Sequence, residues 1–275
     1  MKGCLKTLHQ APLSAKAGLA LILIYSLVAL FAPWLAPYGE TAVVGEGYAP
    51  WGPEFWLGTD NLGRDVLSRL IYGARNTISV AFTITLLAFT LGGLTGLIAA
   101  IKGGWLDQGL SRLVDILMAI PQLIFALLIL SVVGTSTLSL ILVIALLDAT
   151  RVFRLSRAVA MNVVVQDFVE AARLRGEGLG WLIWREVLPN TLPPLIAEFG
   201  LRFCFVFLFI SALSFLGLGI QPPTADWGSM VRENAVMISF GDFTPLLPAL
   251  AVALLTIGVN FVVDWVLHRT SGLKG

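Results

Sequence analysis

The residues with the clearest capacity for chemistry are ionisable groups set within or beside long apolar stretches. Five positions qualify: Asp115, Asp148, Glu198, Arg202 and Asp264. A charge at membrane depth costs several kcal/mol unless a partner neutralises it. Glu198 and Arg202 are four residues apart, which places them on one face of a helix. We predict that they form an intramembrane pair, either as a structural salt bridge or as part of the lining of a polar path.

Two further acids have an arginine within one helical turn. Asp148 lies three residues before Arg151, and Asp115 lies three residues after Arg112. Because residues three apart are neighbours on a helix, we expect each acid to pair with its arginine. The acids are not stacked along one route, so the pattern does not indicate a proton relay.

The chain lacks the combinations of residues that are typical of an enzyme. No nucleophile and base fall at one depth, and no phosphate-binding loop of the form GxxxxGK[ST] occurs. His9 and His268 lie near opposite termini, and Cys4 and Cys204 lie in a tail and in an apolar stretch. We therefore expect no catalytic residue, no metal site and no cofactor on this chain. The net charge of +1 gives no reason to expect nucleic-acid binding.

The elements that position these groups must lie in lipid. Of 275 residues, 57% are hydrophobic and 13% are charged, and the mean hydropathy is +0.87. A soluble domain carries about 25% charged residues. A helix crosses the bilayer core with roughly 20 apolar residues. We predict an all-α membrane protein with about six transmembrane helices, at residues 17–34, 76–101, 113–133, 137–150, 192–216 and 246–267.

The distribution of lysine and arginine predicts the orientation. Most basic residues fall before the first stretch, between the fourth and fifth, and after the last. The other side holds fewer, and acids dilute them. We therefore predict cytoplasmic tails at residues 1–16 and 268–275 around a transmembrane domain at 17–267, with outer segments at about 38–75 and 217–245.

The connection at about residues 160–190 is longer than a link between two helices requires. Asp167 is placed to cap a short helix, and Gly176 permits the left-handed turn that stops it. A second apolar-faced helix begins near Trp181, and Pro189 is expected to end it. An exposed apolar patch rimmed by arginines favours a docking site for a partner protein. The alternative is an amphipathic pair lying on the lipid headgroups.

The spacing within this loop resembles a known signature. The pattern consists of Glu170, Ala171 and Ala172, then Gly176 after three residues, then Glu186, Val187, Leu188 and Pro189 after nine more. It resembles the EAA signature of permeases from binding-protein-dependent ABC importers. The resemblance implies that the loop inserts into a groove of an ATP-binding subunit. It assigns coupling roles to Glu170, Ala171, Ala172, Gly176, Glu186, Leu188 and Pro189. At Glu186 an apolar residue or histidine is commoner in that family.

Other stretches are similar to the dipeptide, oligopeptide and nickel permeases, and their order resembles the second, C-type subunit. They are LGTD at 57–60, LGRD at 62–65, YGAR at 72–75, LSFLGLG at 213–219 and the pairs PP at 222–223 and WG at 227–228. Ser211 departs from the acidic residue that is common before the LSFLGLG run. The charges at residues 60–69 alternate in sign at helical spacing, which favours a helix whose acidic and basic side chains pair with one another. The alternative is contact with a solute-binding protein, for which the candidates are Asp60, Arg64, Asp65, Asp226 and Trp227.

The resemblance implies the fold of a type I ABC importer transmembrane domain with a cytosolic coupling helix. It also implies a bacterial inner membrane, a homologous second permease subunit, two ATP-binding subunits that bind ATP-Mg, and a periplasmic or lipid-anchored solute-binding protein. Di- and oligopeptides are the solutes expected first, ahead of nickel or a nickel chelate, glutathione and opine-like compounds. An ion-coupled secondary transporter is the alternative from another class, but such proteins usually carry an inverted repeat, and none is visible.

Overall fold

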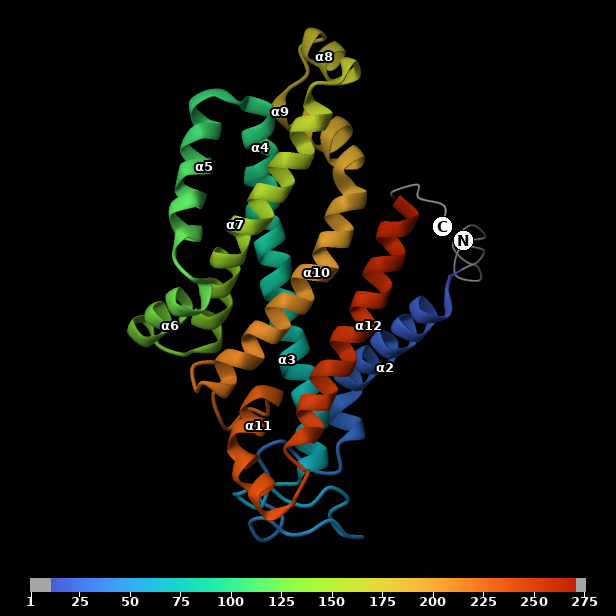
Figure 1. Ribbon diagram of the computed structural model, residues 1–275, viewed down its shortest axis with the longest axis vertical. Helices are drawn as coiled ribbons and strands as arrows, with labels where there is room; N and C mark the ends of the chain where they lie inside the picture. The colour runs from blue at the N-terminus through green and yellow to red at the C-terminus, as the bar shows by residue number, and fades with distance from the viewer. Residues whose placement is uncertain (1–10, 271–275) are drawn as a thin grey trace.

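The computed structural model describes residues 11–270, which form an elongated bundle of helices (Figure 1). Within this range the chain forms helices and loops, with only isolated β-bridges. The predicted tails at 1–16 and 268–275 lie largely outside it. The elements that form the body of the bundle are α2 (Leu13–Leu35), α3 (Val66–Ala88), η1 (Phe89–Gly93), α4 (Leu94–Lys102), α5 (Gly104–Ala119), α6 (Gln122–Val133), α7 (Thr137–Val164), α10 (Leu188–Phe215) and α12 (Leu246–Thr270).

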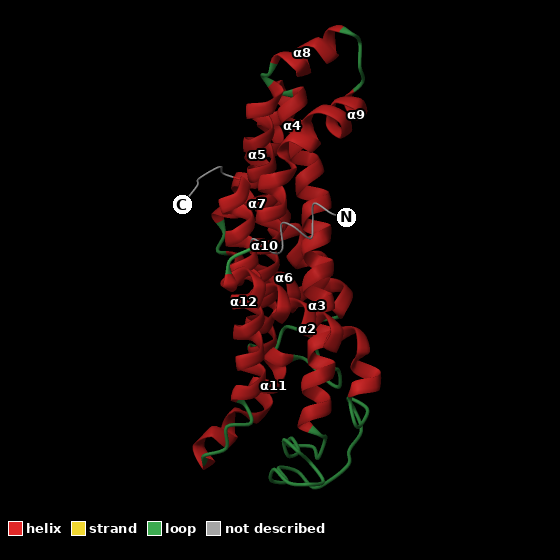
Figure 2. Ribbon diagram, turned by 90° about the vertical axis from the view of Figure 1, so that its right-hand side faces the viewer, coloured by secondary structure: helices red, strands yellow, loops and turns green. Residues whose placement is uncertain are grey.

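The shorter elements lie at the two ends of the bundle, as both views show (Figures 1 and 2). At one end lie α8 (Asp167–Leu174) and α9 (Leu179–Trp181), which leads into η2 (Leu182–Val187). At the other end lie α11 (Trp227–Asn234), η3 (Ala235–Phe240) and the loop that joins α2 to α3. We call these the α8 end (residues 160–190) and the α11 end (residues 36–65 and 217–245).

Four helical runs are long and apolar enough to cross a membrane: Leu13–Leu35, Val66–Lys102, Leu179–Phe215 and Leu246–His268. The number among the described residues is five if the bent pair of α5 and α6 is counted as one span. The remaining predicted crossing, residues 137–150, lies in α7, which carries Asp148, Arg151, Arg154 and Arg157. α7 nevertheless packs along α3, η1 and α4 inside the bundle.

A close approach in the bundle depends on small residues where η1 and α4 cross α7. A Cβ on Gly96 would lie 2.7 Å from the carbonyl oxygen of Phe153. Only glycine therefore fits there without displacing one helix, which is a common device in membrane helix packing. The main buried cluster lies between α3, α7, α10 and α12, and it includes the fully buried Phe207 and Ile210 of α10.

The helix of the second crossing begins ten residues earlier than the predicted start at residue 76. Asp65 is its N-cap, and the carboxylate accepts a hydrogen bond from the Ser68 amide at 2.8 Å. The charged residues Arg69 and Arg75 therefore lie within α3 rather than in an outer segment. The hydropathy pattern missed this start because Arg69 is buried in an ion-pair network, described below.

The predicted third crossing at 113–133 is not one straight helix. α5 and α6 meet at 87° around Pro121. Proline has no amide hydrogen and disfavours the helical conformation in the residue before it. Ile120 is accordingly extended, with φ −89° and ψ 131°. The bend therefore follows from Pro121, and α6 leaves the direction of α5.

Pro189 does not end the second loop helix, contrary to the prediction. The chain is helical from Leu179 to Phe215, and η2 is a π-helical segment directly before α10. Pro189 lies in the first turn of α10, after this change of hydrogen-bond register. The amide of Leu188 bonds five residues back, to the carbonyl oxygen of Ile183, so Pro189 falls where the hydrogen-bond register of the helix changes.

Candidate functional site

The short helix α8 carries the residues that the sequence assigned to coupling, and it lies at the extreme tip of the bundle (Figure 1). Its N-cap is Gln166, and Asp167 is the first helical residue, so the prediction that Asp167 caps this helix was wrong. Asp167 and Glu170 still lie in the first turn, where negative charge is favourable. Gly176 has φ +83°, which confirms the predicted left-handed turn.

One face of α8 packs inward. Val169 and Ala172 are fully buried in a cluster with Leu97 of α4, Ala160 of α7 and Val187 of η2. The guanidinium of Arg173 also donates a hydrogen bond to the carbonyl oxygen of Ile101 at the end of α4, at 3.0 Å. Since three elements meet α8 through one small cluster, a displacement of α8 would act directly on α4, α7 and η2.

The other face of α8 and its surroundings is open. Leu174 is 84% exposed and Trp184 is 62% exposed, and Phe168 and Val165 are also exposed. Of the predicted coupling residues, Glu170, Ala171, Gly176 and Pro189 are exposed, Glu186 and Leu188 are half-buried, and Ala172 is buried. The signature therefore divides into an outward set and one inward residue that anchors the helix.

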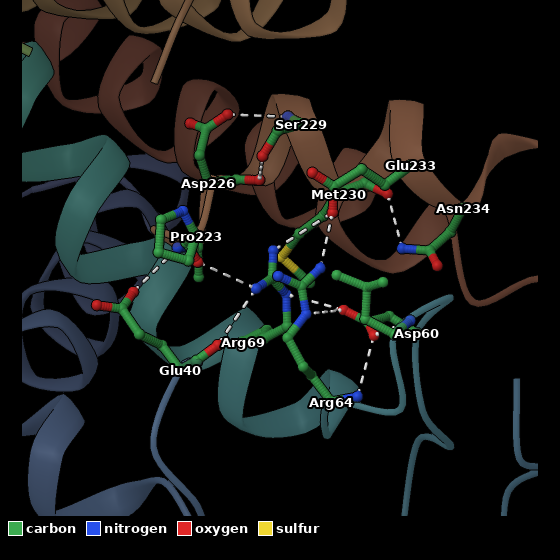
Figure 3. A network of polar contacts seen from close by, with 12 residues as sticks. Glu40, Asp60, Arg64, Arg69, Pro223, Asp226, Ser229, Met230, Glu233 and Asn234 are labelled. Carbon is green, nitrogen blue, oxygen red and sulfur yellow. Dashed lines mark hydrogen bonds and ion pairs between the residues drawn. The ribbon is translucent and has the colours of Figure 1, made fainter. Parts of the chain in front are cut away.

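The α11 end holds a buried ion-pair network (Figure 3). The carboxylate of Asp60 lies 2.6 Å from Nε of Arg64 and 3.3 Å from Nε of Arg69. Glu233 of α11 lies 3.1 Å from Arg64 and 3.5 Å from Arg69. Asp60 and Arg69 are each 1% exposed. This network ties the loop before α3 to α11, and the predicted self-pairing of these charges is present.

The segment that carries these charges is helical only from Val66, so Arg69 lies in a helix and Asp60, Arg64 and Asp65 do not. Asp60 accepts hydrogen bonds from the backbone amides of Leu62 and Arg64, at 2.9 and 3.0 Å, and so shapes a turn. Glu40 adds a second connection across this end. Its carboxylate accepts hydrogen bonds from the Asn76 side chain and from the Ala225 amide, both at 2.9 Å.

Asp226 and Trp227 fix the start of α11. Asp226 caps this helix through the Ser229 amide, at 2.8 Å, and also accepts a hydrogen bond from Thr77 at 3.0 Å. Burial raises the pKa of Asp226, and the hydrogen bonds from Ser229, Ser214 and Thr77 oppose that rise. The indole of Trp227 donates to the carbonyl oxygen of Leu70 at 2.9 Å.

The predicted contact of these residues with a solute-binding protein requires correction. All five candidates are buried inside this chain: Asp60, Arg64, Asp65, Asp226 and Trp227. Their side chains hold the α11 end together and do not reach its surface. The sequence did not predict that Glu40 and Glu233 take part in the polar contacts of the α11 end, because each lies far along the chain from its partners.

The predicted pair of Glu198 and Arg202 is present, with Oε1 and Nε 2.7 Å apart. It has a third member, because Asp148 lies 3.6 Å from Arg202 and is fully buried. The predicted pairing of Asp148 with Arg151 was therefore wrong. The guanidinium of Arg151 instead lies 4.5 Å from the centre of the Phe205 ring.

Two arginines of α7 reach across to acids of α5. Arg157 forms a bidentate contact with Asp107, with the Nη2–Oδ2 pair at 2.6 Å. Arg154 lies 3.9 Å from Asp115, and both are exposed. The expected partner of Asp115, Arg112, is replaced by Arg154 of α7. The spacing of charges within one helix cannot predict such pairs, because it carries no information about which other helix packs against that face.

Comparison with known proteins identifies the class to which this fold belongs. Residues 92–271 match the family described as "Binding-protein-dependent transport system inner membrane component". Residues 14–53 match the N-terminal transmembrane domain of oligopeptide transport permease C. The chain belongs to this family: it is a non-catalytic, multi-pass inner-membrane permease subunit of a binding-protein-dependent ABC importer.

Several relatives are similar along most of their length. The chain is 35% identical to the dipeptide transport system permease protein DppC of Alkalihalophilus pseudofirmus, over 91% of this chain and 83% of that protein. It is 34% identical to DppC of Haemophilus influenzae, over 91% and 87%. The di/tripeptide permease DppC of Pseudomonas aeruginosa is 36% identical, over 91% and 85%.

Solved structures support the fold. The MetNI methionine ABC transporter in inward-facing conformations aligns with a TM-score of 0.55 and 17% identity, over 73% of this chain and 97% of that one. An amino acid ABC transporter with histidines aligns with a TM-score of 0.52 and 20% identity, over 74% and 94%. The predicted class of fold, a type I importer transmembrane domain, is thus confirmed.

Proposed function

We propose that this chain forms half of the membrane path for di- or oligopeptides. The observation that carries the solute class is the similarity of about nine tenths of the chain to permeases named for dipeptides or di- and tripeptides. The match of the N-terminal segment to oligopeptide permease C supports the same assignment. The other half of the path is a homologous permease subunit.

In this proposal the α8 end faces the cytoplasm, both termini are cytoplasmic, and the α11 end faces the periplasm. The excess of lysine and arginine toward the α8 end supports this orientation. Two ATP-binding subunits, which hold ATP-Mg, receive α8 of each permease subunit. A periplasmic or lipid-anchored solute-binding protein delivers the peptide at the α11 end.

The mechanism is alternating access driven through α8. Closure of the ATP-binding subunits moves the two α8 helices together, and the buried face of α8 transmits the movement. Val169 and Ala172 connect it to α4, α7 and η2, and η2 continues into α10 without a break. The helices open outward to accept solute, and hydrolysis restores the inward-facing state. Nucleotide can shift this equilibrium only by binding one state more tightly than the other.

A growth experiment tests the solute class. A strain that requires an amino acid, supplied only as a dipeptide, should stop growing when this chain is deleted and recover with a plasmid copy. Growth on the free amino acid serves as the control and should persist. Unchanged growth on a set of di- and oligopeptides would contradict the proposal, and loss of nickel-dependent enzyme activity instead would favour a nickel importer.

A further inference from the structure

The bend between α5 and α6 encloses a cavity of about 140 Å³. It is lined by Gln122 of α6, by Thr150 and Arg151 of α7, and by apolar residues that include Met118 and Ile120. Arg151 lies halfway along α7, roughly 20 Å from the start of that helix at 1.5 Å per residue. A polar cavity at this depth calls for an occupant, because unpaired polar groups are costly inside a membrane.

The arginines of α7 form a series along α5, and one position in it lacks an acid. Arg157 pairs with Asp107 and Arg154 lies against Asp115. Arg151, one turn further, meets α5 where Pro121 breaks it, and the cavity lies there. Asp148, on the same helix, is within ion-pair distance of Arg202, which also holds Glu198. Among the described residues, Arg151 has a ring contact with Phe205 and forms no ion pair; Asp148 interacts with its charge only from beyond ion-pair distance.

Two further donors face the same space. Both polar atoms of the Gln122 amide are buried and have no hydrogen-bond partner within the described chain. Gln122 is also the first residue of α6, whose N-terminus has no side-chain cap. The first backbone amides of a helix are unpaired and attract an anion. The guanidinium, the side-chain amide and the helix N-terminus therefore offer donors to one small volume.

We propose that this cavity binds a carboxylate, and that its occupant is the terminal carboxylate of the transported peptide. The identity of the solute rests on the proposed function, whereas the preference for a carboxylate rests on the residues that line the cavity. An arginine binds a carboxylate through two parallel hydrogen bonds, which adds geometric specificity. The peptide carboxylate would pair with Arg151 as Asp107 and Asp115 pair with the other two arginines. The small volume of the cavity admits one end group of an extended solute.

The test uses the complete complex of permease and ATP-binding subunits in nanodiscs, without the binding protein. The probes are labelled dialanine, dialaninamide, which lacks the carboxylate, and inorganic phosphate. We expect the wild type to bind dialanine at least tenfold more tightly than dialaninamide. We expect Arg151→Gln to weaken dialanine binding about tenfold or more, as for the loss of a charge-assisted hydrogen bond, and Arg151→Lys to restore part of it.

The matched control is Arg154→Gln, which removes an exposed arginine one turn away and should leave dialanine binding unchanged. Equal binding of dialanine by the wild type and by an intact Arg151→Gln complex would overturn the inference. Phosphate binding at this site as tight as that of dialanine would also overturn it, in favour of a site for a free oxyanion. Absence of binding to a wild-type complex that imports peptides defeats this inference alone, whereas a wild type that imports no peptide defeats the proposed function.

Discussion

The two ends of the bundle are built in opposite ways. The α11 end is held by buried charges, with Asp60, Arg64, Arg69 and Glu233 in one network that joins a loop to two helices. The α8 end is held by a small apolar cluster and one hydrogen bond from Arg173, and it leaves Leu174 and Trp184 open to contact.

This difference separates a rigid end from a movable one. Removing one partner from a buried ion pair leaves an uncompensated charge, so the network resists partial opening. A small apolar cluster has no such penalty for a modest shift of one helix, because apolar contacts are not directional and can persist while the helices slide past each other. An element that must move while attached is better held by apolar contacts, and a surface that must keep its shape is better held by charges.

The largest effect should come from Asp60→Ala. The change leaves Arg64 and Arg69 buried near one remaining acid, and we expect a loss of about 3–5 kcal/mol in the free energy of unfolding. Chemical unfolding of the purified chain in detergent measures it. The control is Glu54→Ala, an exposed acid in the same loop, which should change stability by less than about 0.5 kcal/mol. Equal losses in both variants would show that the network does not hold this end.

The next effect tests whether burial, rather than position at one end, sets the cost of breaking an ion pair. Arg202→Ala leaves both Asp148 and Glu198 without their cation, and we expect a loss of about 3 kcal/mol. Glu198→Ala leaves Arg202 with Asp148 and should cost about 1 kcal/mol. Unfolding of both variants under the same conditions gives the order. A larger loss for Glu198→Ala would contradict the three-membered cluster.

A smaller effect is expected from Gly176→Val at the α8 end. The φ of +83° is unfavourable for a β-branched residue and costs about 1–2 kcal/mol, although no atom lies close enough to clash. The control is Gly178→Ala, which lies two residues on at a negative φ and should be nearly neutral. Thermal unfolding and solute uptake together distinguish a strained turn from general damage. Similar losses in the two variants would mean that the turn is not the cause.

The smallest effect on stability should come from Leu174→Asp. Its side chain is 84% exposed, so the free energy of unfolding should change by less than about 0.5 kcal/mol. Val169→Ala, on the buried face of the same helix, should lose about 1–2 kcal/mol. The two variants compare the contribution to stability of the exposed and buried faces of α8. A large loss for Leu174→Asp would mean that this face packs on the chain itself.

The sequence predicted some local features correctly and the long-range ones poorly. Gly176 and the pair of Glu198 and Arg202 could be predicted, because a turn or a helix face is decided within a few residues. The partner of Arg64 on α11 lies 169 residues away, and no local pattern indicates it. The five docking candidates were misassigned for the same reason, since polar residues in a loop look exposed until the other half of the network is known.

The bend at Pro121 and the continuity at Pro189 show a second limit. Both prolines interrupt the usual hydrogen bonding of a helix, yet one breaks the chain direction and the other lies in an unbroken run. The difference depends on the π-helical segment before Pro189, which changes the hydrogen-bond register. The sequence alone shows that each proline lacks a hydrogen-bond donor, whereas the packing of neighbouring helices decides how the backbone responds.

The most direct test of the contrast between the two ends is affinity purification of the tagged chain from native membranes as Leu174→Asp and as Leu62→Asp. Both leucines are exposed, one at the α8 end and one at the α11 end. We predict that both variants retain the second permease subunit and that only Leu174→Asp loses the ATP-binding subunits. Retention of those subunits by Leu174→Asp, or their equal loss from Leu62→Asp, would contradict the assignment of α8 as the coupling element.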